Sequence, residues 1–354
     1  MFQLPSLAGI ETAISSDNKP KTPLLYSDPS LPPHHYILKL DNSTLEQFQT
    51  CPRSAFYYCI KRRQRQGRHA LVFGGAIHSA LEHIYKTSFT DLRGAKYALL
   101  RHMENENYSP GENWRTPELA LAVIDQYFNQ MSLMDNIKPI THDNALFVER
   151  SFALNLGIFE IDSFLPFTYA ELGIETSEGS DEKCYVHTIH VQWTGKIDLL
   201  ATITSPDQIH VVDHKTSSMG GDTFFKDFEL SQQTVGYAWA AEQILNRPIN
   251  HFCVNALFIR KPTRTGKGCE FERRVYYYPP HQIAEWKVSV MAAVESFVFS
   301  LLHNSFPMHT KWCMGKYGEC QYHSVCSLPP ESRNFALSTR EFSNVSWSPL
   351  KDEI

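Results

Sequence analysis

The sequence lacks the segments that place a protein in or across a membrane. No apolar run approaches the roughly 20 residues that a membrane-spanning helix needs. The first residues, MFQLPSLAGIETAISSDNKPKTP, lack the basic and apolar segments of a secretory signal. We therefore expect a cytoplasmic protein that does not bind membranes.

A large net charge is also absent. The formal net charge is -5 at pH 7, so the protein as a whole has no field that would attract nucleic acid. Positive charge gathers instead in KRRQRQGRH at 61–69 and RKPTRTGKG at 260–268. A solvated loop or helix end explains either stretch equally well. If these stretches bind DNA, the candidate residues are Lys61, Arg62, Arg63, Arg65, Arg260, Lys261, Arg264 and Lys267.

No internal repeat divides the chain, and a periodic pattern begins near residue 36. Residues 1–35 are rich in Pro, Ser and Asp, which predicts an extended or disordered arm. Helical and then strand-like patterns fill 36–328, with a helical insertion at about 88–135 and a polar tail at 329–354. The order of helices, strands, helix and strand predicts one α/β domain.

The segment IHVVDHKTSS at 209–218 carries two charged residues at the end of a β-branched run that predicts a buried strand. Asp213 and Lys215 are two residues apart, so their side chains point to the same face of that strand. An exposed ion pair of little energetic value is the ordinary explanation for this spacing. The preceding strand, in TGKIDLLATI, carries Asp198, which antiparallel pairing would bring close to Asp213.

Two carboxylates in one small volume repel each other unless a cation lies between them. Mg²⁺ and Mn²⁺ prefer oxygen ligands and also accept an imidazole. His78 supplies an imidazole from FGGAIHSALEHIYK, a predicted helix that begins after a glycine pair. Lys215 could then offset negative charge that develops on a phosphate.

The segments GGAIHSALE, GKIDLL, VVDHK and QTVGY follow one another in this order. Together they resemble the motifs of the PD-(D/E)XK nuclease superfamily, in the RecB-like branch that includes the RecB and AddAB nuclease domains and CRISPR-associated RecB-like exonucleases. The resemblance implies a restriction-endonuclease-like core, in which helices flank a mixed central sheet, with a helical insertion.

The resemblance also implies roles for particular residues. The implied metal ligands are His78, Asp198, Asp213 and the backbone carbonyl of His214. Lys215 would be the catalytic lysine, and Gln233 and Tyr237 match a Q-x-x-x-Y motif that positions substrate and lysine. Glu82 and Glu149 occupy places where the family often has a glutamate, and we expect them to support the metal ligands.

Clustered cysteines in a cytoplasmic protein indicate metal ligands rather than disulfides. KWCMGKYGECQYHSVC contains Cys313, Cys320 and Cys326, and Cys51 lies far upstream in TCPRS. A centre on these four would join the N- and C-terminal parts of the domain. Some RecB-like members hold a four-iron, four-sulfur cluster on one early and three late cysteines, so the resemblance implies such a cluster here.

The spacing of these cysteines departs from that pattern in one place. Six residues lie between Cys313 and Cys320, where two are common in the family. Structural zinc is the alternative, because zinc binds four cysteines, or three cysteines and a histidine such as His323.

The implied function is a deoxyribonuclease that uses Mg²⁺ or Mn²⁺ to hydrolyse phosphodiester bonds. An exonuclease on single-stranded or end-containing DNA, in repair, recombination or phage DNA processing, fits the RecB-like branch. One alternative is a nuclease-fold protein that binds DNA without cutting, although every motif residue is present. Another is a subunit that works with a helicase or recombination partner, because the chain has no Walker-type GKS or GKT and thus no motor of its own.

Overall fold

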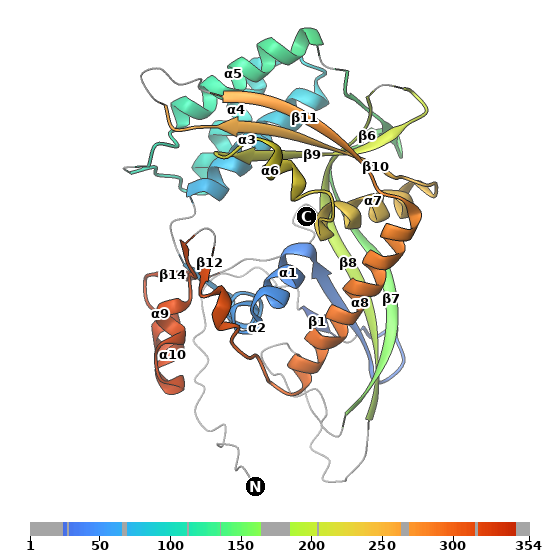
Figure 1. The fold of residues 1–354 in the computed structure, drawn as a ribbon, viewed down its shortest axis with the longest axis vertical. Coiled ribbons are helices and arrows are strands. Elements are labelled where there is room, and N and C mark those ends of the chain that lie inside the picture. Colours follow the sequence, from blue (N-terminus) through green and yellow to red (C-terminus); the bar gives the residue numbers. More distant parts are fainter. Residues whose placement is uncertain are drawn as a thin grey trace.

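Eight strands form one mixed sheet in the described part of the chain (Figure 1). The structure, a computed structural model, describes residues 24–26, 28–65, 69–111, 113–134, 136–163, 185–203, 205–262, 269–315 and 318–344. The strand order is β1 (Leu25–Tyr26), β2 (His35–Asp41), β8 (Tyr185–Thr202), β9 (Ile209–Ser217), β10 (His251–Ile259) and β11 (Cys269–Tyr277). Two more strands, β4 (Lys138–Pro139) and β7 (Val148–Ser163), pair with β8.

Strand β8 changes partner along one of its edges. Its first part pairs with parallel β2 as far as Thr194, and its last part pairs with antiparallel β9 from Leu199 onward. Along the opposite edge, β7 is antiparallel to β8. Residues 195–198 therefore lie where β2 has ended and β9 has not yet begun, and the sheet is open on that side.

Helices cover both faces of the sheet, as predicted. Helices α3 (His69–Lys86), α4 (Leu92–Asn105) and α5 (Pro117–Met134) share a core with Leu257 and Ile259 of β10. Helices α1 (Asn42–Thr50), α7 (Gln232–Leu245) and α8 (Pro280–Leu302) share the largest core with Ala256 and Phe258. Because alternate residues of a strand point to opposite faces, the two cores lie on opposite sides of β10. Helices α4 and α5 occupy the predicted insertion.

Shorter elements connect and extend this core. Near the N-terminus these are α2 (Pro52–Ala55), the π-helix η1 (Phe56–Ile60) and β3 (Arg63–Arg65). In the middle of the chain they are β5 (Thr141–His142), β6 (Ala145–Leu146) and α6 (Asp222–Lys226). Toward the C-terminus they are the 3-10 helix η3 (Thr310–Trp312), β12 (Met314–Gly315), β13 (Gly318–Glu319), α9 (His323–Cys326), α10 (Pro330–Leu337) and β14 (Phe342–Asn344).

The two ends of the described chain pack onto the core. Residues 1–23 of the predicted arm lie outside the described residues, but Leu24 and Leu25 are buried and β1 pairs with β2. In the predicted tail, β14 pairs with β3. A small core that contains Tyr57, Tyr322 and Phe342 joins the C-terminal segment to η1. The segment that carries the late cysteines is therefore held against the segment that follows Cys51.

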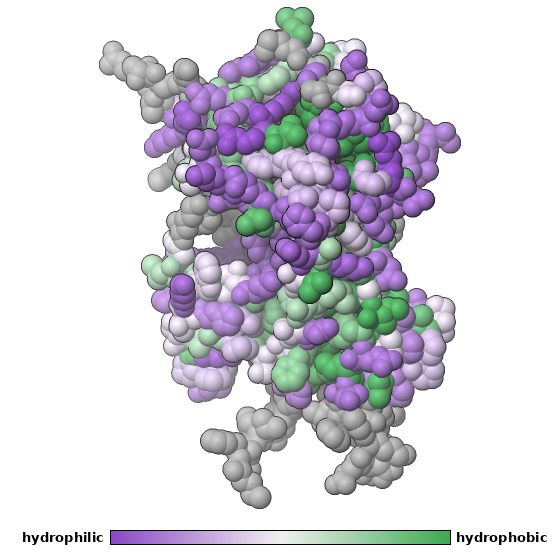
Figure 2. All heavy atoms as spheres, turned by 45° about the vertical axis from the view of Figure 1, so that its right-hand side comes forward, coloured by the Kyte–Doolittle hydropathy of each residue, from purple (hydrophilic) through white to green (hydrophobic). Residues whose placement is uncertain are grey.

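The surface is uneven in polarity and in shape. A space-filling view shows the face hollowed between its upper and lower parts, with hydrophilic residues inside the hollow (Figure 2). None of the described helices is long and apolar enough to cross a membrane.

Candidate active site

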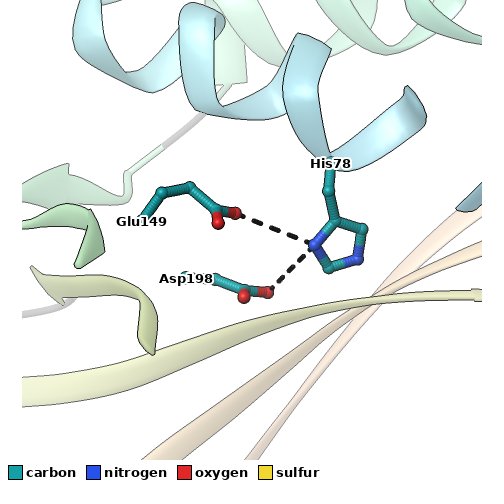
Figure 3. Close-up of side chains that lie close together, drawn as sticks. All are labelled: His78, Glu149 and Asp198. Atoms are coloured by element: carbon teal, nitrogen blue, oxygen red, sulfur yellow. Dashed lines mark ion pairs between the residues drawn. The ribbon is translucent and has the colours of Figure 1, made fainter. Parts of the chain in front are cut away.

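His78, Glu149 and Asp198 meet where the sheet is open (Figure 3). His78 projects from α3, Glu149 from β7 and Asp198 from β8. The Nδ1 atom of His78 is 3.5 Å from Oδ2 of Asp198 and 3.8 Å from Oε1 of Glu149. One donor atom from each residue lies within 4.8 Å of the other two. Both distances from His78 are too long for hydrogen bonds, so the three side chains surround a common point without being bonded to one another.

Helix α3 brings His78 to this point because a glycine lets it approach the sheet. A Cβ atom on Gly74 would lie 3.0 Å from Oγ1 of Thr216, near the end of β9. A side chain at position 74 would press on the Thr216 side chain, whereas one at position 75 would meet His102 of α4. Gly74 therefore lets α3 lie close to β9.

Glu149 reaches the site through an unusual backbone conformation. Its neighbours Val148 and Arg150 pair with Leu199 and Ile197, which places Glu149 opposite Asp198. Its φ of 53° lies in the left-handed region, which costs a residue other than glycine about 1–3 kcal/mol. Strain of this kind is kept only where the surrounding structure imposes it, and it is common at functional sites.

The two carboxylate oxygens of Glu149 have different surroundings. Oε2 lies 3.0 Å from Nζ of Lys196, which comes two residues before Asp198 on β8. Oε1 is buried and has no hydrogen-bond partner in the described part of the chain. A buried carboxylate oxygen without a partner is costly unless a cation binds it. Lys196 therefore orients Glu149 so that Oε1 remains available to an ion.

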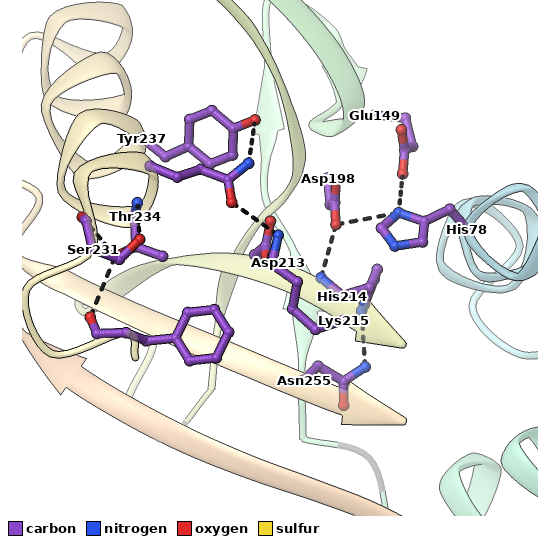
Figure 4. A network of polar contacts seen from close by, with 12 residues as sticks. His78, Glu149, Asp198, Asp213, His214, Lys215, Ser231, Thr234, Tyr237 and Asn255 are labelled. Atoms are coloured by element: carbon purple, nitrogen blue, oxygen red, sulfur yellow. Dashed lines mark hydrogen bonds and ion pairs between the residues drawn. The ribbon is translucent and has the colours of Figure 1, made fainter. Parts of the chain in front are cut away.

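A chain of polar contacts lies beside His78, Glu149 and Asp198 (Figure 4). It links Asp213, Lys215, Gln233 and Tyr237. Nζ of Lys215 lies 2.8 Å from Oδ2 of Asp213 and donates to Oε1 of Gln233 at 3.0 Å. The Gln233 amide in turn donates to the hydroxyl of Tyr237 at 3.5 Å, which is a weak contact. Of the two Q-x-x-x-Y residues, Gln233 therefore contacts the lysine and Tyr237 contacts Gln233.

A buried polar network fixes His214 behind the site. Its backbone N–H donates to Oδ2 of Asp198 at 2.7 Å, and its ring Nδ1 lies 2.8 Å from Nδ2 of Asn255. The Asn255 amide also donates to the Tyr127 hydroxyl, and Arg273 donates to Oδ1 of Asn255. Because the amide nitrogen is a donor, the His214 Nδ1 atom is the acceptor and the proton of the neutral ring sits on Nε2. Tyr127 belongs to α5, so the insertion helps to position the strand that carries Asp213.

The three side chains fit a divalent ion. Two ligand atoms that each lie about 2.1 Å from one Mg²⁺ ion can be at most about 4.2 Å apart, twice that bond length. The distances of 3.5 and 3.8 Å are within this limit. Two carboxylates and one imidazole are ligands that Mn²⁺ and Mg²⁺ accept. The site can therefore hold such an ion without a large rearrangement.

The electrostatics of the site also favour a bound cation. Burial, together with the nearby carboxylates of Asp213 and Glu149, raises the pKa of Asp198 to about 7 against the opposing effects of His78 and Lys215. Burial lowers the pKa of His78, but Asp198, Glu149 and Asp213 outweigh burial and raise it to about 9. Without an ion, protons thus bind where a metal would bind.

Lys215 keeps its proton in spite of being enclosed. Burial lowers the pKa of its ammonium, but Asp213 and Asp198 raise it above the ordinary value. Lys215 is therefore a cation at neutral pH. Burial also raises the pKa of Tyr237, whose hydroxyl stays neutral.

The four predicted cysteines lie around one pocket. Cys51, Cys313, Cys320 and Cys326 line a small cavity of about 20 Å³, and all four thiols are free. The backbone N–H of Cys320 donates to the carbonyl of Cys313, which closes the loop between them. The long interval between these two cysteines therefore does not keep them apart. His323, the alternative zinc ligand, also lines this pocket and pairs with Glu319 at 2.6 Å.

The comparison with protein-family models agrees with this geometry. The model of the PD-(D/E)XK nuclease superfamily matches residues 41–327. The chain belongs to the PD-(D/E)XK nuclease superfamily. A solved structure of a proposed exonuclease from Eubacterium rectale is similar at 12% identity and a TM-score of 0.47, over 78% of this chain and 85% of that one. Comparison with curated proteins finds no match.

Most of the predicted site residues lie together in the structure. They are His78, Asp198, Asp213, Lys215, Gln233 and Tyr237. Glu149, predicted only to support the ligands, contributes an oxygen atom to the group of donor atoms that it forms with His78 and Asp198. Asp213 lies outside that group and pairs with Lys215. A ligand role for Asp213 and for the His214 carbonyl stays a prediction.

Two residues of the site were missed in the sequence. Lys196 precedes Asp198 by two residues, so the two side chains share one face of the strand. Asp213 and Lys215 have the same spacing, but there the aspartate comes first. This spacing could have indicated Lys196. Asn255 gave no such signal, because it lies within an apolar strand and its contacts depend on the register with β9 and β11.

Other predicted residues lie elsewhere. Glu82 follows His78 by one helical turn but pairs with Lys86, so we assign it no part in the site. Arg260 pairs with Glu270, and Lys61 lies over the ring of Phe56. Arg63 and Arg65 belong to β3, Arg62 precedes it, and Lys261 is exposed. Arg264 and Lys267 lie outside the described residues.

The protonation of Asp198 and His78 predicts how metal affinity depends on pH. Metal ligands must lose their protons, and these pKa values are about 7 and about 9. We expect Mn²⁺ affinity, measured by calorimetric titration, to rise between pH 6 and pH 8 by roughly tenfold per pH unit for each displaced proton. An affinity that stays constant or falls over this range would show that these groups do not bind the ion.

Proposed function

We propose that the protein is a metal-dependent deoxyribonuclease. The observation that carries this proposal is the arrangement of Lys215 and Asp213 beside the ion-binding group of His78, Glu149 and Asp198. This arrangement gathers three carboxylates, an imidazole and a charged lysine at one opening in the sheet. A phosphodiester is the kind of substrate that needs both a divalent ion and a fixed cation at the reacting group.

His78, Glu149 and Asp198 would hold Mg²⁺ or Mn²⁺, with Asp213 and the His214 carbonyl as further ligands. When bound, the ion supplies Lewis-acid chemistry and lowers the pKa of water. The chain itself supplies positioning and charge. The Lys215 ammonium stands ready to offset the negative charge that develops on the phosphate oxygens, and Gln233 keeps its long side chain directed into the site.

We infer that the substrate is DNA that is single-stranded or has free ends, and that the chain belongs to the RecB-like branch. The Q-x-x-x-Y contacts with the catalytic lysine support this assignment. Exonuclease action in repair, recombination or phage DNA processing follows from it, alone or with a helicase partner. The free thiols of the described cysteines favour a reducing compartment such as the cytoplasm.

A non-catalytic DNA-binding subunit is the alternative function. Such a protein has no need for a strained glutamate or for a buried lysine held by two partners. Here Glu149 keeps its left-handed backbone, and Lys215 keeps both Asp213 and Gln233. These features favour the enzyme.

Replacement of Lys215 tests the enzyme directly. Lys215→Ala should lower the rate of DNA cleavage at least a hundredfold, because a preorganised charge at the reacting phosphate is lost. Cleavage of an end-labelled oligonucleotide in Mg²⁺ or Mn²⁺ measures this rate, and circular dichroism checks the fold. Lys287→Ala, which removes an exposed lysine of α8, is the matched control. Equal cleavage by the wild type and the folded Lys215→Ala variant would rule out the assigned role.

We further propose that the cysteine pocket holds a four-iron, four-sulfur cluster that stabilises the fold. In a tetrahedral zinc site with Zn–S bonds of about 2.3 Å, the sulfur atoms are about 3.8 Å apart. Among the described residues, no three of the cysteine sulfurs lie within 4.8 Å of one another. An iron–sulfur cube binds each cysteine at a different iron and holds the sulfurs farther apart, so this spacing supports the cube over zinc, and the cavity of about 20 Å³ would have to widen to admit the cube.

Loss of one cysteine should remove this centre. Cys320→Ser, purified without oxygen, is expected to lose iron, sulfide and visible absorption, and to melt at a lower temperature than the wild type because the two ends of the domain are no longer joined. Cys269→Ser is the control, since this cysteine lies on β11 outside the pocket and donates to Gln126, as a serine also can. A Cys320→Ser protein with unchanged melting temperature would contradict the structural role. Zinc in place of iron in the wild type would contradict the cluster.

A further inference from the structure

A cleft opens beside Lys215, and its lining does not include His78, Glu149 or Asp198. Its volume is about 780 Å³, which is in the range of sites that enclose a small molecule such as one or two nucleotides. Lys215 lines one part of it, and the residues that follow, 216–220, continue its wall. The cleft therefore begins at the residue that would act on the phosphate.

The lining of the cleft combines hydroxyl groups, aromatic rings and a few charges. Thr216, Ser217, Ser218 and Thr223 contribute hydroxyl groups. Half-buried Phe224 and Phe228, whose ring centroids are 5.2 Å apart, contribute an apolar wall. Polar groups that track a backbone, together with aromatic faces that take bases, are the usual features of a single-strand binding groove.

Arg115 is the cation of the cleft that has no carboxylate partner in the described part of the chain. Lys215 is already paired with Asp213. One carboxylate, Asp227, also lines the cleft and makes other contacts. Arg115 is therefore the side chain best placed to meet the negative charge of a ligand.

The insertion holds Arg115 in a defined position. Its guanidinium lies over the ring of Trp114, 4.3 Å from the centroid. Its backbone N–H donates to Oδ1 of Asn113, and its carbonyl accepts from the hydroxyl of Tyr108. The loop before α5 is thus fixed at both sides of Arg115. A guanidinium that is held by stacking loses less freedom when it binds a phosphate.

We propose that this cleft binds the stretch of single-stranded DNA next to the scissile phosphate, with Arg115 on a backbone phosphate and a base against Phe224 and Phe228. The proposal rests on the nuclease function proposed above and adds the residues that select a single strand. A base can reach the aromatic wall only when it is unpaired, because the cleft is too small for a duplex. Arg115 is a binding residue and takes no part in the chemical step.

Binding of a fluorescein-labelled oligodeoxynucleotide, measured by fluorescence anisotropy in EDTA at several salt concentrations, tests this proposal without any cleavage. Arg115→Ala should weaken the binding about tenfold. It should also flatten the plot of log affinity against log salt by about 0.7, the contribution of one phosphate contact on a single strand. Arg115→Lys keeps the charge and should restore the slope. Arg101→Ala, at an exposed arginine of α4 that lines a separate hollow, should change neither quantity.

Cleavage kinetics in Mg²⁺ give the second measurement. We expect Arg115→Ala to raise KM with little change in kcat for a single strand. Unchanged affinity and salt slope in a folded Arg115→Ala variant, or an equal loss in Arg101→Ala, would overturn the cleft proposal and leave the nuclease standing. Wild-type protein that neither binds nor cuts the strand would overturn the nuclease proposal and this one with it.

Discussion

The structure depends on placing three carboxylates in one partly closed volume without leaving their charges unbalanced. Strand β8 makes this possible, because it loses one partner at Thr194 and gains the next at Leu199. Asp198 lies in that interval, where no neighbouring strand fills the edge. Each carboxylate has a basic neighbour: His78 for Asp198, Lys196 for Glu149 and Lys215 for Asp213. These neighbours and bound protons can balance the charge of the carboxylates, and a divalent ion at His78, Glu149 and Asp198 would displace the protons.

The rest of the fold supports this opening from both sides. On one face, α3 approaches closely enough at Gly74 to bring in His78, and α5 contributes Tyr127 to the network that fixes His214. On the other face, α7 presents Gln233 to Lys215. The segment around α5 contributes in two ways. Tyr127 of α5 binds Asn255, which holds His214 of β9, and the loop before α5 carries Arg115 to the cleft proposed for the substrate strand.

Much of the site follows from the sequence, because strands alternate with a period of two. That period predicts Asp213 and Lys215 on one face, where they pair with each other, and the antiparallel pairing of β8 with β9 begins at Leu199, next to Asp198. Glu149 could not be assigned in the same way, since its contribution depends on a left-handed φ that nothing in the local sequence indicates. Arg115 was not predicted either, because the loop that carries it is held by individual local contacts with Asn113 and Tyr108 rather than by a periodic pattern.

The most direct test of the central claim is the cleavage of end-labelled single-stranded DNA, linear duplex DNA and a closed circle by the wild-type protein in Mg²⁺, Mn²⁺ or EDTA. We expect cutting with either ion and none in EDTA, and we expect the single strand to be degraded while the closed circle stays intact. A folded protein that leaves all three substrates uncut with either ion would show that the site is not a nuclease site.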